Sequence, residues 1–170
     1  MKFLVNGDLG NNKLLQIILF FVLSYMAVFW ATNTLLYIEK IGFTRSSVVD
    51  YYLGSEEEFK NPVSYLGLLE STHFHLFVFA MALLLINHLT VFFNIPQSLK
   101  LSLIILSFLS GLGNMAAGWL IRFISPSFAY FKIGSFIVLQ ICFLLLLIFS
   151  FFAIKTYEQR PKGNGLNKKP

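Results

Sequence analysis

Charged residues are scarce in this sequence. Asp, Glu, Lys and Arg make up only 12% of its 170 residues, whereas hydrophobic residues make up 56%. A soluble globular domain carries about twice that charged fraction. The composition therefore excludes an ordinary soluble domain and indicates a chain that lies in a lipid bilayer.

Cysteine is almost absent too. The single cysteine, Cys142, cannot form an intrachain disulfide, and its apolar sequence surroundings predict a small buried side chain. CxxC pairs, P-loops, GxGxxG and GxSxG motifs are also missing. These absences remove the signals of thiol redox chemistry, nucleotide binding and serine hydrolysis, and they favour a protein that is not an enzyme.

What the sequence has instead is long hydrophobic runs. Each run has at least 21 residues, enough for a helix to cross a hydrocarbon core of about 30 Å. The runs are 14–37, 66–93, 101–121 and 133–154. They predict an all-α integral membrane protein, a four-transmembrane-helix antiparallel bundle. We expect a single domain over residues 1–157 and a basic disordered tail over residues 158–170.

The distribution of Lys and Arg predicts the orientation. With a cytoplasmic N-terminus, eight of the 13 basic residues fall on the inner side, and the other five are Lys40, Arg45, Lys60, Arg122 and Lys132. This asymmetry favours a bacterial inner-membrane protein with its N- and C-termini in the cytoplasm. We interpret the basic tail as a contact with anionic lipid rather than with nucleic acid.

The connections between the spans are also informative. The segment from Thr44 to Tyr52 begins with Thr and Ser and carries an apolar stripe, which predicts a short helix at the membrane interface. Gly54 is expected to end this helix. The loop 94–100 is short, so the second and third spans are predicted to be antiparallel neighbours.

The second span carries all three histidines and a glutamate. Ionisable side chains cost about 2.5–3.5 kcal/mol each at the bilayer centre. At about 100° per residue, Glu70, His73 and His88 share one face of the helix, whereas His75 points away from it. His73 and His88 are about 22 Å apart along the helix axis.

One hypothesis for this face is a b-type haem. His73 and His88 would be axial ligands, one toward each membrane surface, and Met115 or Met26 could complete a His–Met pair within one chain. Because every histidine lies on the second span, bis-histidine ligation would need a second copy of the chain.

Two other hypotheses remain open. Glu70, His73 and His75 have the Glu-x-x-His and His-x-His spacings that are typical of di-iron, copper and zinc sites, although no matching Glu-x-x-His occurs on another span. In the remaining hypothesis no cofactor binds, and the histidines position the helix at the interface. In each case Glu70 needs a partner, and we expect an ion pair with Arg122.

The third span has a face of small and polar residues. They are Ser107, Gly111, Asn114 and Gly118. Small residues at this spacing allow another helix, or a flat ligand, to approach the backbone closely. Asn114 needs a hydrogen-bond partner, for which His88, Asn87 or a ligand carbonyl would serve.

Three segments, 51–58, 68–77 and 122–130, resemble a group of small bacterial four-span membrane proteins, and THFHLF at 72–77 is the most specific motif. The resemblance covers most of residues 14–157. It implies the fold and an inner-membrane location but no activity.

In architecture the chain is also similar to di-haem cytochrome b subunits, which pass electrons between quinone and partner proteins. Those subunits place histidines on two or more helices, whereas this sequence has them on one.

These patterns point first to a redox-linked membrane subunit. It would hold haem b or a similar cofactor on the face of Glu70, His73 and His88 and pass electrons to or from a partner. The alternative is a structural or assembly subunit of a larger membrane complex, without a cofactor. Both hypotheses place the chain in the lipid bilayer as a homodimer or as part of a larger complex.

Overall fold

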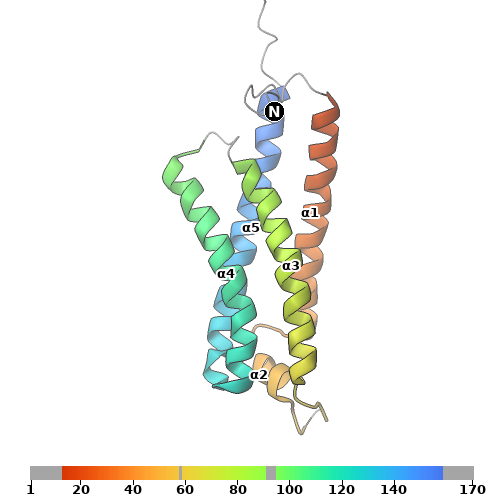
Figure 1. The fold of residues 1–170 in the computed structure, drawn as a ribbon, viewed down its shortest axis with the longest axis vertical. Helices are drawn as coiled ribbons and strands as arrows, with labels where there is room; N and C mark the ends of the chain where they lie inside the picture. The colour runs from red at the N-terminus through yellow and green to blue at the C-terminus, as the bar shows by residue number, and fades with distance from the viewer. Residues whose placement is uncertain (1–12, 58, 91–94, 159–170) are drawn as a thin grey trace, which may run out of the picture.

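Four long helices form the body of the molecule (Figure 1). The computed structural model describes residues 13–57, 59–90 and 95–158, with side chains as far as residue 152. The long helices are α1 (Lys13–Lys40), α3 (Tyr65–Leu89), α4 (Gln97–Phe123) and α5 (Ala129–Glu158), and the shorter elements are α2 (Arg45–Leu53) and the 3-10 turn η4 (Pro126–Phe128).

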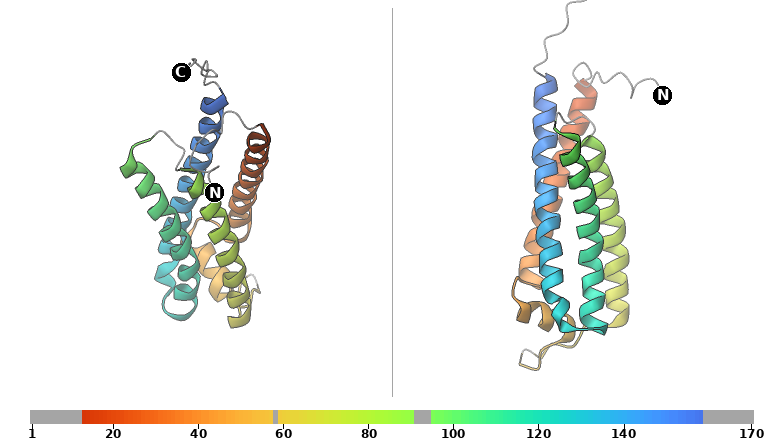
Figure 2. Two further views of the ribbon diagram at one scale, coloured as in Figure 1. Left: turned by 45° about the horizontal axis from the view of Figure 1, so that its top comes forward. Right: turned by 90° about the vertical axis from the view of Figure 1, so that its left-hand side faces the viewer.

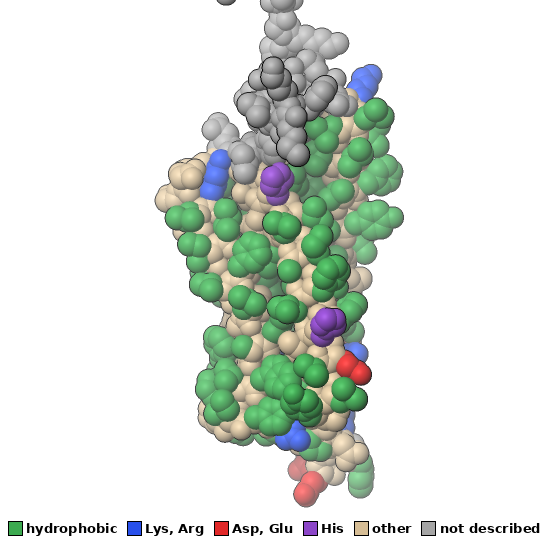
Figure 3. Space-filling model, in the orientation of Figure 1, with side chains coloured by type: hydrophobic (Ala, Val, Ile, Leu, Met, Phe, Trp, Pro, Cys, Tyr) green, Lys and Arg blue, Asp and Glu red, His purple; other side chains and the backbone are tan. Residues whose placement is uncertain are grey.

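The long helices run antiparallel, so the start of α1 and the end of α5 lie at the same end of the bundle (Figures 1 and 2). Helix α5 packs against each of the other helices. Its inward side supplies much of the core, which includes Leu83, Ile86, Leu139, Phe143 and Leu146. Hydrophobic side chains also cover the outer surface (Figure 3), as expected for a surface that faces lipid. The chain is an all-α, four-span membrane protein, as the sequence predicts.

Three of the four long helices, α1, α4 and α5, extend beyond the predicted spans at both ends. Helix α5 begins at Ala129 because Ser125, Pro126 and the η4 turn start the helix directly after α4. Lys132 therefore lies within the first turn of α5, and its predicted place in an outer loop is wrong. Helix α3 ends at Leu89, before the predicted limit of 93. The predicted basic tail beyond Glu158 lies outside the described residues.

Helix α2 lies across one end of the bundle (Figure 1). The Thr44 side chain caps its first turn by accepting a hydrogen bond from the backbone N–H of Ser47 at 3.1 Å. Gly54 ends it with a φ of +83°, a conformation that side-chain-bearing residues rarely adopt. These observations confirm the predicted short helix, which closes the bundle over the site described next.

Candidate functional site

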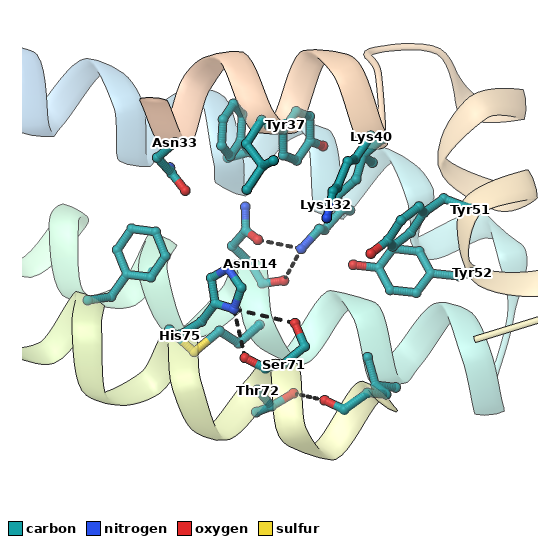
Figure 4. Close-up of a pocket in the computed structure, with 17 residues that line it drawn as sticks. Asn33, Tyr37, Lys40, Tyr51, Tyr52, Ser71, Thr72, His75, Asn114 and Lys132 are labelled. Carbon is teal, nitrogen blue, oxygen red and sulfur yellow. Dashed lines mark hydrogen bonds between the residues drawn. The ribbon is translucent and has the colours of Figure 1, made fainter. Parts of the chain in front are cut away.

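A cavity of about 160 Å³ lies inside the bundle, at the end that α2 covers. The five helices all contribute to its wall (Figure 4). Apolar side chains such as Phe79, Met115 and Phe136 form part of this wall. Its polar side chains are Asn33, Tyr37, Lys40, Tyr51, Tyr52, Ser71, Thr72, His75, Asn114 and Lys132. Ten polar side chains, contributed by all five helices, therefore line one cavity.

Lys132 is the buried amine of this cavity, with only 6% of its surface exposed. Its Nζ donates hydrogen bonds to the backbone carbonyl of Asn114 at 2.9 Å and to Asn114 Oδ1 at 2.5 Å. It also lies 5.7 Å from the centre of the Tyr52 ring. Two oxygen acceptors and a ring face favour the charged form of the amine, whereas its burial opposes that form. Among the described residues that line the cavity, none is an Asp or Glu that could neutralise this charge.

Two polar atoms in the same cavity lack partners. The Tyr37 hydroxyl and Asn114 Nδ2 are buried and, within the described part of the chain, make no hydrogen bond. Tyr37 itself is 6% exposed and is held by stacking on Phe136, with ring centres 3.6 Å apart. Buried polar groups in proteins are nearly always satisfied, so these two donors indicate space for a hydrogen-bonding ligand or water.

His75 completes the wall from α3. Its Nδ1 donates a hydrogen bond to the backbone carbonyl of Ser71 at 2.7 Å, which leaves the lone pair on Nε2 in the neutral ring. Figure 4 shows the ring beside Asn114, across the cavity from Tyr37. The Nε2 atom of His75 can therefore accept a hydrogen bond from a bound molecule.

Tyr52 forms the lid of the cavity. Its ring packs directly on Gly118, where a Cβ atom would come within 3.0 Å of Tyr52 Cε1. Burial, with smaller contributions from Tyr51 and Tyr37, raises the pKa of the Tyr52 hydroxyl above its usual range. The hydroxyl therefore stays protonated and remains a hydrogen-bond donor. Gly118 does permit a close approach, as the sequence predicts, but the side chain that uses it belongs to α2.

The predicted haem ligands lie elsewhere. Glu70, His73 and His88 are exposed on the outward face of α3, and Figure 3 shows histidine side chains among the hydrophobic ones on this face. Within the described part of one chain no second imidazole faces His73 or His88, so a bis-histidine haem does not fit a single copy. Met115 and Gly111 line the cavity instead, and Met26 packs against the core.

The predicted metal ligands are not brought together either. His75 faces the cavity while Glu70 and His73 face outward. Among the residues that the structure describes there is no group of three His, Cys, Asp or Glu side chains arranged to hold a metal ion. This separation follows from their positions on opposite sides of one helix.

Arg122 has a different partner from the predicted one. Its Nε donates a hydrogen bond to the backbone carbonyl of Val63 at 2.9 Å, and its guanidinium lies 5.5 Å from the centre of the Phe123 ring. Over the described ranges, no ion pair joins Arg122 to Glu70. The arginine therefore ties α4 to the segment that precedes α3.

The partner of Asn114 also differs from the prediction. Asn114 binds Lys132, whereas Asn87 donates to Ser107 Oγ at 3.1 Å and His88 is exposed. The expectation of His88 or Asn87 is wrong because α5 starts early enough to bring Lys132 alongside the middle of α4.

A family model described as a transmembrane helical domain matches residues 42–161. The chain belongs to this family. The matched range contains α2 to α5 and therefore Lys132, Asn114 and His75, but it excludes Tyr37 of α1. No curated protein and no solved structure matches the chain.

Sequence reasoning missed Lys132 and Tyr37 as site residues. Both were near the predicted span ends, where Lys and Tyr side chains commonly reach the membrane surface. A signal for Lys132 was nevertheless present. Pro126 marks a helix start, and a helix that begins there places Lys132 on the same side as the buried Phe136.

Proposed function

We propose that this multi-pass membrane protein is a non-enzymatic binding subunit that holds a small anionic group in the cavity at the end of the bundle that α2 covers. The observation that carries the proposal is the buried Lys132, which has oxygen acceptors but, among the described residues, no carboxylate partner. A buried ion without a counter-charge costs several kcal/mol. Ionisable residues kept inside a membrane protein usually mark a ligand or ion site.

The donors of the cavity match an anion. Lys132 has one ammonium hydrogen beyond the two that bind Asn114, and the Tyr37 hydroxyl and Asn114 Nδ2 add two unpaired donors. A carboxylate or phosphate group accepts several hydrogen bonds at once. In size, the cavity of about 160 Å³ is close to the roughly 150 Å³ that accommodates one benzene ring. A ligand head of about that size is therefore expected.

The test is anion binding to the purified protein in detergent. Acetate, benzoate and phosphate are titrated by calorimetry against wild type, Lys132→Met and the control Lys100→Met, which removes the same charge at the other end of the bundle. We expect one of these anions to bind wild type and the control equally, and Lys132→Met at least about tenfold more weakly, the value of a charge-assisted hydrogen bond. Equal binding to both variants, or no binding to wild type, would contradict the proposal.

A redox-linked role with haem b is a second candidate. The observation that favours it is the exposure of His73 and His88 on the same outward face, where a second copy of the chain could supply opposing histidines. The group, when bound, would supply one-electron chemistry, and this chain would supply the imidazole ligands. We also propose the bacterial inner membrane, with both termini cytoplasmic, for either function.

An absorption spectrum of the purified protein, oxidised and then reduced with dithionite, tests this second candidate. A reduced b-type spectrum that loses one component in His73→Ala and another in His88→Ala supports haem ligation. A colourless protein, or full cofactor retention in both variants, contradicts it. A protein that binds neither anions nor haem would be a structural or assembly subunit.

A further inference from the structure

The cavity has a mouth, which we define by the three exposed residues of its wall: Leu36 and Lys40 of α1 and Ser71 of α3. Leu36 is 49% exposed, whereas Lys132 on the inner wall is 6% exposed. The mouth therefore lies between α1 and α3 and faces sideways, toward the surface that contacts lipid. In Figure 4, Lys40 and Ser71 lie on opposite sides of the opening.

Specific contacts close the other sides. Trp119 Nε1 donates a hydrogen bond to Thr72 Oγ1 at 2.8 Å, which joins α4 to α3. The stack of Tyr37 on Phe136 joins α1 to α5. Tyr52 covers the end at α2.

The gap between α1 and α3 ends at a pair of aromatic rings. Phe29 of α1 and Phe79 of α3 meet edge to face with ring centres 5.7 Å apart. Phe79 also lines the cavity, so this ring pair closes its deep side. A bound molecule that extends beyond the cavity must therefore leave sideways, past Leu36.

We infer that the occupant is the carboxylate head of a single-chain amphiphile that enters from the bilayer. This inference rests on the proposed function, because it uses the same cation. The carboxylate binds Lys132, and the alkyl chain passes Leu36 into the lipid. Lys40, the last residue of α1, stands at the mouth, where a second cation attracts the head from the membrane surface.

Cavity size separates a carboxylate from the larger heads of two-chain phospholipids. A cavity of roughly 150 Å³ accommodates the six carbon atoms of benzene, so about 160 Å³ holds about six non-hydrogen atoms. A carboxylate and two or three methylenes have that size, whereas a glycerophosphate with two acyl esters exceeds it. The apolar residues in the wall, including Leu36 and Phe79, provide contacts for the first methylenes.

The experiment compares dodecanoate with acetate. Both carry a carboxylate, but dodecanoate reaches the site from the lipid phase and acetate reaches it from water. Binding is measured in detergent to wild type, with Lys132→Met as the background for nonspecific partitioning. Dodecyltrimethylammonium, which has an alkyl chain of the same length but a positively charged head, is the control for charge. We expect dodecanoate to bind at least tenfold more tightly than acetate, and the cationic probe to show no binding above the Lys132→Met background.

A variant of the mouth tests the route. Leu36→Trp should weaken dodecanoate binding at least tenfold more than it weakens acetate binding, because the added ring lies in the path of the alkyl chain. Leu35→Trp is the matched control, because Leu35 is exposed on the same helix but does not line the cavity. Circular dichroism and thermal melting verify that both variants fold.

The outcomes separate the two proposals. Acetate that binds as tightly as dodecanoate would overturn the amphiphile and leave the proposed anion site intact. An unchanged affinity of Leu36→Trp for dodecanoate would overturn the lateral route. Binding of neither acid above the Lys132→Met background would overturn the inference, and the proposed function would fall as well if benzoate and phosphate also showed no binding.

Discussion

The coupling between Lys132 and Asn114 provides the sharpest test of whether the cavity serves binding or stability. Removing either side chain alone leaves a buried polar group without its partner. Lys132→Met removes the amine and leaves Asn114 Oδ1 without a donor. Asn114→Leu leaves the Lys132 amine without its side-chain acceptor. The double substitution Lys132→Met/Asn114→Leu removes both groups together, as well as the unpaired Nδ2.

Magnitudes follow from these contacts. An unpaired buried oxygen costs about 1–3 kcal/mol, and breaking one side of a buried charged pair costs about 3–5 kcal/mol. We therefore expect Lys132→Met to lose about 1–3 kcal/mol of unfolding free energy and Asn114→Leu to lose about 3–5 kcal/mol. The double variant removes the charge and the oxygen together, so neither cost remains, and replacing a buried polar pair by apolar side chains is often neutral or stabilising. Its stability should equal that of wild type or exceed it by about 1 kcal/mol.

The assay is reversible unfolding in mixed micelles, followed by circular dichroism without added anion. A double variant that loses about the sum of the two single losses would show that the residues are not coupled. A double variant several kcal/mol less stable than wild type would show that the lysine stabilises the fold. Either result would refute the reasoning that Lys132 is kept for a ligand at a cost in stability.

Three further predictions concern the walls of the cavity. Gly118→Ala should destabilise the bundle by about 1–3 kcal/mol, because the added Cβ meets the Tyr52 ring. Gly134→Ala is the control: nothing lies within 4 Å of its added Cβ, so it should stabilise the bundle by about 0.5–1 kcal/mol. Thermal melts compare the two variants, and equal effects would refute the contact between Gly118 and Tyr52. Thr72→Val should cost about 1–3 kcal/mol by leaving Trp119 Nε1 unpaired, and an unchanged melt would contradict that hydrogen bond. Because the folded pKa of Tyr52 is raised, folding stability should fall above pH 10.0, where the unfolded tyrosine ionises, and Tyr52→Phe should lessen that fall in unfolding titrations at alkaline pH; the same slope in both proteins would contradict it.

The sequence predicted the spans well because span length and hydrophobicity are local properties. The four helices, the short helix over Arg45–Leu53 and its end at Gly54 all followed from composition, capping residues and turn residues. The site was predicted less well. His75 was assigned correctly to the side of α3 opposite His73 and His88, but the chemistry was placed on the outward face.

The reason lies in what periodicity measures. A helical wheel shows which residues share a face, but it does not show whether that face meets a helix or lipid. In an apolar span both faces are hydrophobic, so the usual contrast between core and solvent is missing. The exposed face of Glu70, His73 and His88 therefore looked like the functional one, and haem ligation there stays a prediction.

The sequence by itself determined the fold class of this protein, since hydrophobic runs of this length can satisfy their backbone hydrogen bonds in a membrane only as helices. Only the tertiary structure decided that Lys132, Asn114 and Tyr37 surround one cavity. These residues lie on three different helices, and Lys132 is 18 residues from its partner Asn114. Which of their faces meet depends on how each helix is rotated and offset against its neighbours, and that is set by side-chain packing across the whole bundle.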